Sequence, residues 1–383
     1  MTPGAFLPFL ALLGVGTICS SMIIPFMAFF LVEGLGRDPW VIGLYSGSGI
    51  ILTVAFNWGI ARWIDAGARV LPLVLVAACG FGVAALTLSI SPSFAMVMSV
   101  GLVGFAVSSS AVSTMFSAGG HLAETLKVER SRSNALMRAT TSAAWMIGPA
   151  FSFLLADQFG AAAVFPVCAV LSLVWLGLAF SVIPSSMTAP APAPGGVETK
   201  AAPGLLLWLA AAYVFCLALA HSLTFTALPL FYVQEVGLPG FAPGMAFSVK
   251  TFVEIFAIFA TPALIARFGM RRSLLGTTAL AVVAILVLAS VSSFPQMLGA
   301  AALEGLYYGL FASLGLSYLQ SFAVDRPAQA TAIYWNTLKI AGLVAGPVAG
   351  LIAQFHSFQL VVQTASLVAL LAFAVLALSA RVR

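Results

Sequence analysis

Long apolar runs occupy most of this chain of 383 residues. A transmembrane helix needs about 20 mainly apolar residues, and twelve runs reach or approach that length. Only 7% of the residues are charged, whereas a soluble domain carries about 25%, so the chain could not cover a water-facing surface. A β-barrel would instead show short alternating segments. The runs lie at residues 5–31, 40–60, 70–90, 94–120, 133–156, 161–183, 204–232, 242–265, 273–292, 295–322, 331–354 and 358–379. The sequence therefore predicts an all-α membrane protein with twelve transmembrane helices, the first run being a retained span rather than a signal peptide.

The basic residues predict the orientation of the spans. Of the sixteen Lys and Arg residues, twelve fall in alternate loops and at the C-terminus, and the opposite loops hold only Arg37. Cytoplasmic loops of membrane proteins carry the excess of Lys and Arg. Both termini are therefore expected to face the cytoplasm.

A Pro-, Ala- and Gly-rich stretch divides the chain into two halves. Residues 184–203 lack apolar periodicity and are typical of a semi-flexible linker. The flanking segments, residues 1–183 and 204–383, each contain six predicted spans. Similar motifs recur in the same order about 200 residues apart, as expected for two bundles of one design. They include Gly148-Pro149 with Gly346-Pro347, and Asp65-Ala-Gly67-Ala-Arg69 with Arg267-Phe-Gly269-Met-Arg271.

Five charged residues lie inside the apolar runs: Arg138, Lys250, Glu254, Glu304 and Lys339. A charge in mid-bilayer costs about 2.5–3.5 kcal/mol on insertion scales, so such residues mark candidate functional sites. Lys250 and Glu254 are four residues apart and share one helix face. They are interpreted either as a structural ion pair or as a proton or substrate site.

Aromatic and amide side chains accompany the other three charges. Tyr307 and Tyr308 lie one turn from Glu304, and a carboxylate beside a flat ring suits a carbohydrate; the alternative is a buried ion pair between Glu304 and Lys339. Trp335 and Asn336 precede Lys339 on the same span and could line the same pocket.

Arg138 shares a helix face with Trp145, which favours cavity lining. The alternative is that Arg138 extends its side chain to the cytoplasmic headgroups. His221 could join a proton path, although a lone buried His is more often a packing residue.

Several segments together resemble the major facilitator superfamily and, within it, the bacterial sugar efflux transporters. They are Pro39-Trp40-Val-Ile-Gly43, Met137-Arg138 through Trp145 to Gly148-Pro149, Leu230 through Glu235 to Pro239, Glu254-Ile255, and Gln320 with Asn336. The resemblance implies two pseudo-symmetric six-helix bundles that expose a central site to one side at a time. It also implies proton-driven export of sugar-like molecules from a bacterial cell across its inner membrane.

The charged residues inside the apolar runs, together with the resemblance, indicate roles for particular residues. Glu254 is the first choice for proton coupling, with Lys250 and Glu304 as further members. Substrate contacts would come from Arg138, Trp145, Glu304, Tyr307, Trp335, Asn336 and Lys339. Two charged loops would act as gates through Asp65, Gly67, Arg69, Arg267, Gly269, Arg271 and Arg272.

Other function classes remain open or are disfavoured. A multidrug/proton antiporter, an importer of anionic sugars or organic acids, and a non-transporting receptor on the same fold are the alternatives. No phosphate-binding loop, zinc motif or nucleophile triad occurs. We therefore expect no enzymatic activity, no cofactor and no nucleic-acid partner. We expect the protein to act as a monomer in the lipid bilayer.

Overall fold

Twelve helical segments long and apolar enough to cross a membrane occur in the described part of the chain. A computed structural model describes residues 6–65, 67–126, 129–188, 205–322 and 327–378. The ends of the observed spans differ from the predicted ones by three residues or fewer. The prediction of an all-α protein with twelve spans is confirmed, because uninterrupted apolar length is a direct consequence of bilayer thickness.

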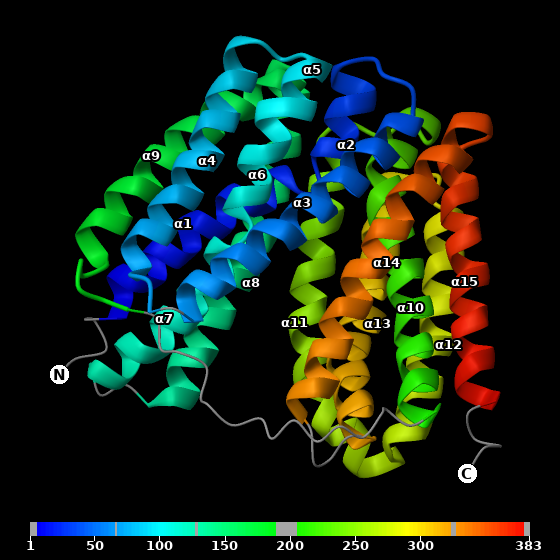
Figure 1. Ribbon diagram of the computed structural model, residues 1–383. Coiled ribbons are helices and arrows are strands. Elements are labelled where there is room, and N and C mark those ends of the chain that lie inside the picture. Colours follow the sequence, from blue (N-terminus) through cyan, green and yellow to red (C-terminus); the bar gives the residue numbers. More distant parts are fainter. Residues whose placement is uncertain (1–5, 66, 127–128, 189–204, 323–326, 379–383) are drawn as a thin grey trace. The chain divides into compact units, whose positions relative to one another are not determined.

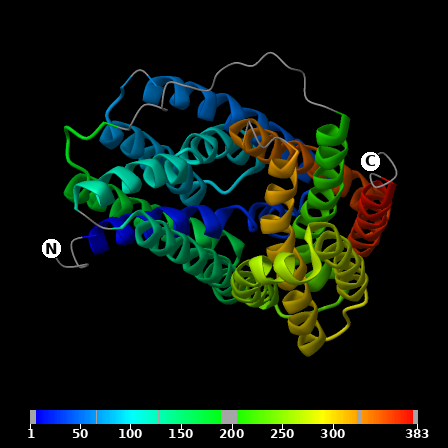
Figure 2. The same ribbon diagram turned by 90° about the horizontal axis from the view of Figure 1, so that it is seen from below.

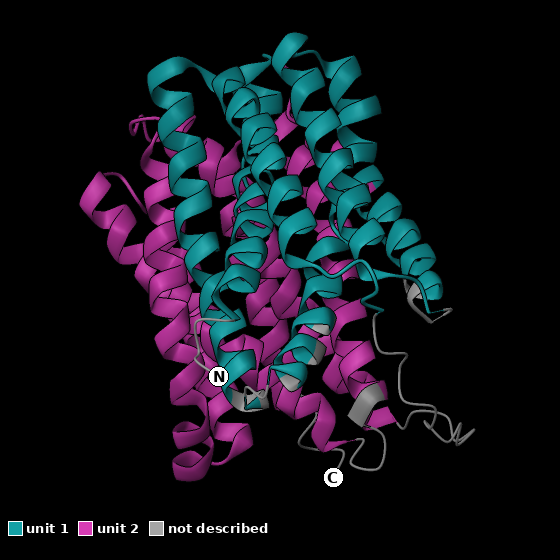
Figure 3. Cartoon of the chain, turned by 90° about the vertical axis from the view of Figure 1, so that its left-hand side faces the viewer, with its two compact units in different colours: residues 1–36, 48–198 teal, residues 37–47, 199–383 magenta. Residues whose placement is uncertain are grey.

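The helices form two compact units (Figure 3). One comprises residues 1–36 and 48–198, and the other residues 37–47 and 199–383. Residues 189–203, most of the predicted linker, lie outside the described residues. The division into halves at 1–183 and 204–383 stays a prediction.

Unit 1 contains the helices of the first half of the chain (Figure 1). They are α1 (Leu7–Ile23), α2 (Met27–Phe29), η2 (Phe30–Gly34), most of α3 (Trp40–Asp65), α4 (Val70–Ile90), α5 (Phe94–Met96), η3 (Val97–Gly101), α6 (Leu102–Ser108), α7 (Ala111–Thr125), α8 (Arg130–Phe159), η4 (Ala161–Ala163) and α9 (Val164–Val182).

Unit 2 contains the helices of the second half, and Figure 2 shows α10 (green) beside α15 (red). They are α10 (Leu205–Leu230), η5 (Phe231–Glu235), α11 (Ala242–Phe268), α12 (Met270–Ala289), α13 (Phe294–Ser321), α14 (Pro327–Phe355) and α15 (Phe358–Leu378).

The same helix pairs pack in both units. In unit 1, α1 packs against α8 and α9, and α4 packs against α6 and α9. Their counterparts in unit 2 do the same: α10 packs against α14 and α15, and α12 packs against α13 and α15. The first span of each half also ends in a π-helical turn, η2 or η5. The internal repeat in the sequence therefore corresponds to a structural repeat.

The beginning of α3 belongs to unit 2 because it packs closely on α14. A β-carbon at Gly43 would lie 2.7 Å from Cα of Pro347. The backbone N–H of Trp40 also donates to Oε1 of Gln354 at 3.3 Å. α14 continues through Pro347, so the predicted Gly346-Pro347 motif serves as a site of close helix packing.

Glu235, at the end of η5, caps the N-terminus of α15. Its Oε1 accepts a hydrogen bond from the backbone N–H of Phe358, and its Oε2 accepts one from Gln359 at 2.9 Å. The first N–H groups of a helix have no intrahelical partners, and a carboxylate there also interacts favourably with the helix dipole.

We expect Glu235→Ala to lower the free energy of unfolding by about 1–2 kcal/mol, the usual cost of removing an N-cap acceptor. Thermal unfolding of the purified protein in detergent would measure this. Glu235→Gln keeps one acceptor oxygen and should lose less. Equal stability of the Ala variant and the parent would contradict the capping role.

Candidate functional site

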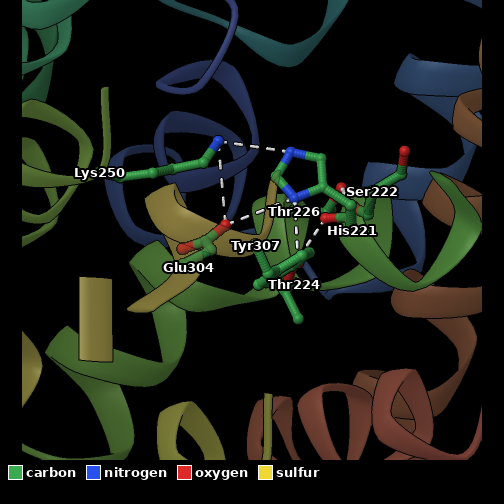
Figure 4. A network of polar contacts seen from close by, with 7 residues as sticks. All are labelled: His221, Ser222, Thr224, Thr226, Lys250, Glu304 and Tyr307. Carbon is green, nitrogen blue, oxygen red and sulfur yellow. Dashed lines mark hydrogen bonds and ion pairs between the residues drawn. The ribbon is translucent and has the colours of Figure 1, made fainter. Parts of the chain in front are cut away.

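Four polar side chains from three helices meet inside unit 2 (Figure 4). His221 comes from α10, Lys250 from α11, and Glu304 and Tyr307 from α13. All four are buried by protein, with exposed fractions of 7% for His221, 5% for Lys250, 3% for Glu304 and 0% for Tyr307. A lysine and a glutamate this deeply buried require each other as partners, because an isolated charge would pay the full desolvation cost.

The ion pair at the centre is between Lys250 and Glu304. Lys250 Nζ lies 3.8 Å from Oε1 of Glu304, and Nδ1 of His221 lies 3.5 Å from the same oxygen. His221 also contacts Lys250, with 3.3 Å between Nε2 and Nζ, and Tyr307, with 3.3 Å between Nδ1 and the hydroxyl oxygen. The imidazole therefore bridges the ammonium, the carboxylate and the phenol.

The contacts of Lys250 fix the tautomer of His221. A lysine ammonium carries three donors and no acceptor, so Lys250 donates and Nε2 of His221 accepts. The neutral imidazole then carries its proton on Nδ1, which faces Glu304 and Tyr307. In this arrangement the neutral His221 ring lies between the negative carboxylate of Glu304 and the positive ammonium of Lys250.

The aromatic ring of Tyr308 contacts two members of the cluster. Its ring stacks on His221 with a centroid separation of 3.7 Å and an interplanar angle of 22°. Lys250 Nζ lies 4.7 Å from the centroid of the same ring, within the range of a cation–π interaction. Tyr308 therefore holds both the imidazole and the ammonium in place.

Two glycines one turn apart on α13 bring the helix onto α11. A β-carbon at Gly305 would overlap the carbonyl oxygen of Lys250, and one at Gly309 would lie 3.1 Å from Cα of Glu254. Small residues at this spacing let helix backbones approach closely in membranes. Gly305 and Gly309 therefore bring Glu304 beside Lys250.

We expect Gly305→Ala to destabilise the protein by about 1–3 kcal/mol, the usual cost of overpacking a close contact, because the backbone carbonyl of Lys250 cannot move aside alone. Gly299→Ala is the matched control on the same helix, since nothing lies within 4 Å of a β-carbon there. Thermal unfolding in detergent should show a loss for Gly305→Ala and no loss for Gly299→Ala. Equal melting temperatures would argue against close helix contact at Gly305.

The structure joins Lys250 to Glu304, a partner on another helix. Glu254, one turn from Lys250 on α11, is half-buried and has no ion-pair partner within the described ranges. The i,i+4 relation between Lys250 and Glu254 holds in sequence, but the ammonium turns towards α13. Glu304 in turn pairs with Lys250 and His221 rather than with Lys339.

The three predicted site residues of α14 lie outside this cluster. They are Trp335, Asn336 and Lys339, and all three are exposed at the surface of the protein. The exposed fraction of Trp335 is 55%. The ring of Trp335 packs edge-on against Tyr334 with centroids 5.5 Å apart. Among the residues that the structure describes, Lys339 has no ion-pair partner.

Arg138 and Trp145 lie on α8 of unit 1. Arg138 is exposed and Trp145 is half-buried. The hydroxyl of Thr141 donates to the Arg138 carbonyl at 2.9 Å. Further along, Ser152 donates to the Met22 carbonyl at 2.9 Å, so the Gly148-Pro149 part of α8 packs tightly on α1.

The two predicted gate loops share one backbone feature. Gly67 and Gly269 have φ angles of +79° and +78°, which glycine adopts without strain. Arg69 precedes α4 and pairs through its backbone with Thr188. The side chain of Asp65 lies outside the described residues.

The arginines of the second loop lie at helix ends. Arg271 Nη2 donates to the Ala377 carbonyl at 3.5 Å, near the C-terminal end of α15. Arg267 Cζ lies 5.3 Å from the ring centroid of Phe268, and Arg272 is exposed. Cations favour the C-terminal end of a helix dipole, so Arg271 stabilises α15 in this arrangement.

Two parts of the site were underestimated from sequence. His221 was weighed as a lone polar residue, and its place at the centre depends on three helices coming together. The Gly305-Leu-Tyr-Tyr-Gly309 spacing, with two small residues four apart in an apolar span, is the sequence signal that indicates this close packing. Within the described residues, no group of three His, Cys, Asp or Glu side chains is placed to hold a metal ion.

Comparisons with known proteins agree with this architecture. The sequence model of the Major Facilitator Superfamily matches residues 9–241 and 210–383. Sugar efflux transporter A of Dickeya chrysanthemi is 24% identical over 372 residues, which cover 94% of this chain and 90% of the relative. Sugar efflux transporter C of Escherichia coli is 27% identical over 376 residues, covering 94% and 91%.

Solved structures match over nearly the whole length. The nucleoside transporter NupG superposes with a TM-score of 0.82 at 13% identity, covering 98% of each chain. A bacterial homologue of the iron transporter ferroportin gives a TM-score of 0.73 at 16% identity, covering 99% of each chain. At these identities the structural likeness establishes the fold alone.

Proposed function

The chain belongs to the major facilitator superfamily of membrane transporters, and we propose that it exports sugars or sugar-like small molecules, driven by protons that move the opposite way. It is a multi-pass membrane transporter and not an enzyme. Alternating access is the mechanism proposed: the protein exposes its site to one side of the membrane at a time.

The charge count of the buried cluster carries the proposal of proton coupling. Lys250 can neutralise only one carboxylate, and the structure pairs it with Glu304. Glu254 is one turn away on the same helix, half-buried and without an ion-pair partner in the described part. With His221 neutral, the group of Lys250, Glu304 and Glu254 carries one net negative charge, and one bound proton would cancel that charge.

Proton coupling is therefore assigned to Glu254 first, with Lys250 and Glu304 completing the group. When the proton is bound, the group of Lys250, Glu304 and Glu254 is neutral; when it leaves, the group is negative. The two states interact differently with the surrounding helices, so each can favour a different conformation of the transporter.

The named relatives and the side chains available support the proposed substrate class. Two relatives are called sugar efflux transporters. Flat rings and hydrogen-bonding groups suit the C–H faces and hydroxyls of a sugar. The proposed contacts are Arg138 and Trp145 from unit 1, and Glu304, Tyr307, Trp335, Asn336 and Lys339 from unit 2.

Orientation in the membrane, gating and oligomeric state are also proposed. The excess of Lys and Arg in alternate loops supports cytoplasmic termini, and the bacterial relatives support the inner membrane. The loops with Asp65, Gly67 and Arg69, and with Arg267, Gly269, Arg271 and Arg272, are proposed as gates. The protein is proposed to act as a monomer.

A flux assay in proteoliposomes tests the proposal. Vesicles with an imposed pH gradient would be given neutral sugars, anionic sugars and cationic dyes in parallel. We expect proton-driven movement of a neutral sugar, opposite to the proton gradient, and loss of that movement when the gradient is collapsed. Transport of the anionic sugars alone, driven with the gradient, would favour the importer, and transport of the dyes alone would favour the multidrug antiporter.

A further inference from the structure

We propose that His221 is a proton relay between Lys250 and Glu304, an inference that rests on the proposed proton coupling. Its two ring nitrogens contact different partners: Nε2 lies 3.3 Å from Lys250 Nζ, and Nδ1 lies 3.5 Å from Glu304 Oε1. An imidazole can accept a proton at one nitrogen and release one from the other. His221 is the side chain that provides this double contact between the ammonium and the carboxylate.

The carboxylate has an open position for the arriving proton. Glu304 Oε1 is buried and accepts no hydrogen bond from the residues that the structure describes. It lies just outside hydrogen-bond range of Nδ1, and a charge-assisted hydrogen bond between the two would be about 2.7–2.9 Å long. A movement of less than about 1 Å would therefore complete the path.

The proposed step balances in protons. The Lys250 ammonium gives a proton to Nε2 of His221, and Nδ1 of His221 gives its own proton to Oε1 of Glu304. The N–H bonds at Nζ and Nδ1 break, and the bonds to Nε2 and Oε1 form. The charged pair becomes a neutral amine and a neutral carboxylic acid, and the ring changes only its tautomer.

Two tyrosines orient the ring, and one of them, Tyr307, is also a hydrogen-bond partner of Nδ1. Tyr308 stacks on the imidazole, and the Tyr307 hydroxyl lies 3.3 Å from Nδ1. Of the other elements packed on α10, α15 carries no titratable side chain, and η5 contributes the buried hydroxyl of Tyr232 and the capping Glu235.

Two further elements complete the set of nearby charges. α14 carries Tyr334 and the exposed Lys339, and α11 carries the half-buried Glu254 beside Lys250. Glu254 is the more exposed of the two carboxylates, and Glu304 is the deeply buried one.

Two substitutions separate a relay from a structural contact. His221→Gln places an amide near the position of Nε2, and His221→Asn places one near Nδ1, so each variant keeps one of the two contacts and neither passes a proton. Thr226→Val is the matched control on α10, since the Thr226 hydroxyl donates only to the Ser222 carbonyl, at 2.8 Å, in the described region.

The readout compares two kinds of transport in proteoliposomes. Exchange of labelled for unlabelled neutral sugar, at equal pH on both sides, needs no net proton movement. Proton-driven export needs the relay. We expect both His221 variants to retain exchange and to lose proton-driven export at least about 100-fold, in the range of a lost proton-transfer group, while Thr226→Val keeps both.

Three results would overturn the relay. Normal proton-driven export in either His221 variant would show that one contact is enough. Loss of exchange in both variants, with folded protein, would assign His221 to substrate movement. Absence of proton-driven export in the parent protein would reject the proposed function together with the relay, whereas the first two results would leave the proposed function intact.

Discussion

Replacing Lys250 with methionine is expected to lower the free energy of unfolding by about 3–5 kcal/mol, the cost of breaking a buried ion pair from one side. The side chain keeps nearly the same length, but Glu304, 3% exposed, loses the cation at 3.8 Å. His221 is then the remaining polar neighbour of its Oε1 atom among the described residues. Thermal or denaturant unfolding in detergent would measure the change.

A second substitution tests whether the pair causes the loss. In the double variant Lys250→Met with Glu304→Gln, no charge is stranded, so most of the lost stability should return. Lys339→Met is the matched control: Lys339 is exposed and has no ion-pair partner in the described ranges, so its change should stay within about 0.5 kcal/mol. Losses in the double variant that equal the sum of the two single losses would show that the two residues do not interact.

The second large effect concerns transport. Glu254→Gln should lower proton-driven export at least about 100-fold, because an amide cannot bind and release the proton that a carboxylate carries. The fold should survive, since Glu254 is half-buried and no ion pair holds it in the described part of the chain. Flux into or out of proteoliposomes under an imposed pH gradient would measure the loss.

Asp157, which has an exposed carboxyl group, provides the control for the Glu254 variant. Asp157 lies near the end of α8, exposed from the protein, and Asp157→Asn should leave proton-driven export unchanged. The Glu254 variant should still unfold near the parent temperature. Export at the parent rate in the Glu254 variant would remove this residue from the coupling mechanism.

The spans could be predicted closely because a single property determines them. The length of an apolar run is set by the bilayer, and the ends of the observed spans lie within three residues of the predicted runs. The π-helical turns η2 and η5 could not be predicted, since hydropathy does not distinguish a π-helical turn from an α-helical one. Nor could the sequence assign the beginning of α3 to unit 2, because that depends on its packing against α14.

The members of the site could be predicted better than their pairing. Lys250 and Glu304 were identified as buried charges, because each costs energy inside a membrane. Sequence spacing favoured Glu254 as the neighbour of Lys250, and Lys339 was the alternative partner of Glu304. The structure pairs Lys250 with Glu304 instead, because helix-to-helix contacts depend on the rotation of each helix, which single-sequence spacing does not give.

The close approach at Gly305 and Gly309 also limits which helices can shift. With the backbone of α13 seated directly on that of α11, there is no layer of side chains through which one could slide past the other. These two helices should travel as a rigid pair, and the spacing between Lys250 and Glu304 should survive any rearrangement of unit 2. α10 is not held in this way, so a shift of that helix would break or make the contacts of His221 and thereby switch the path of the proton.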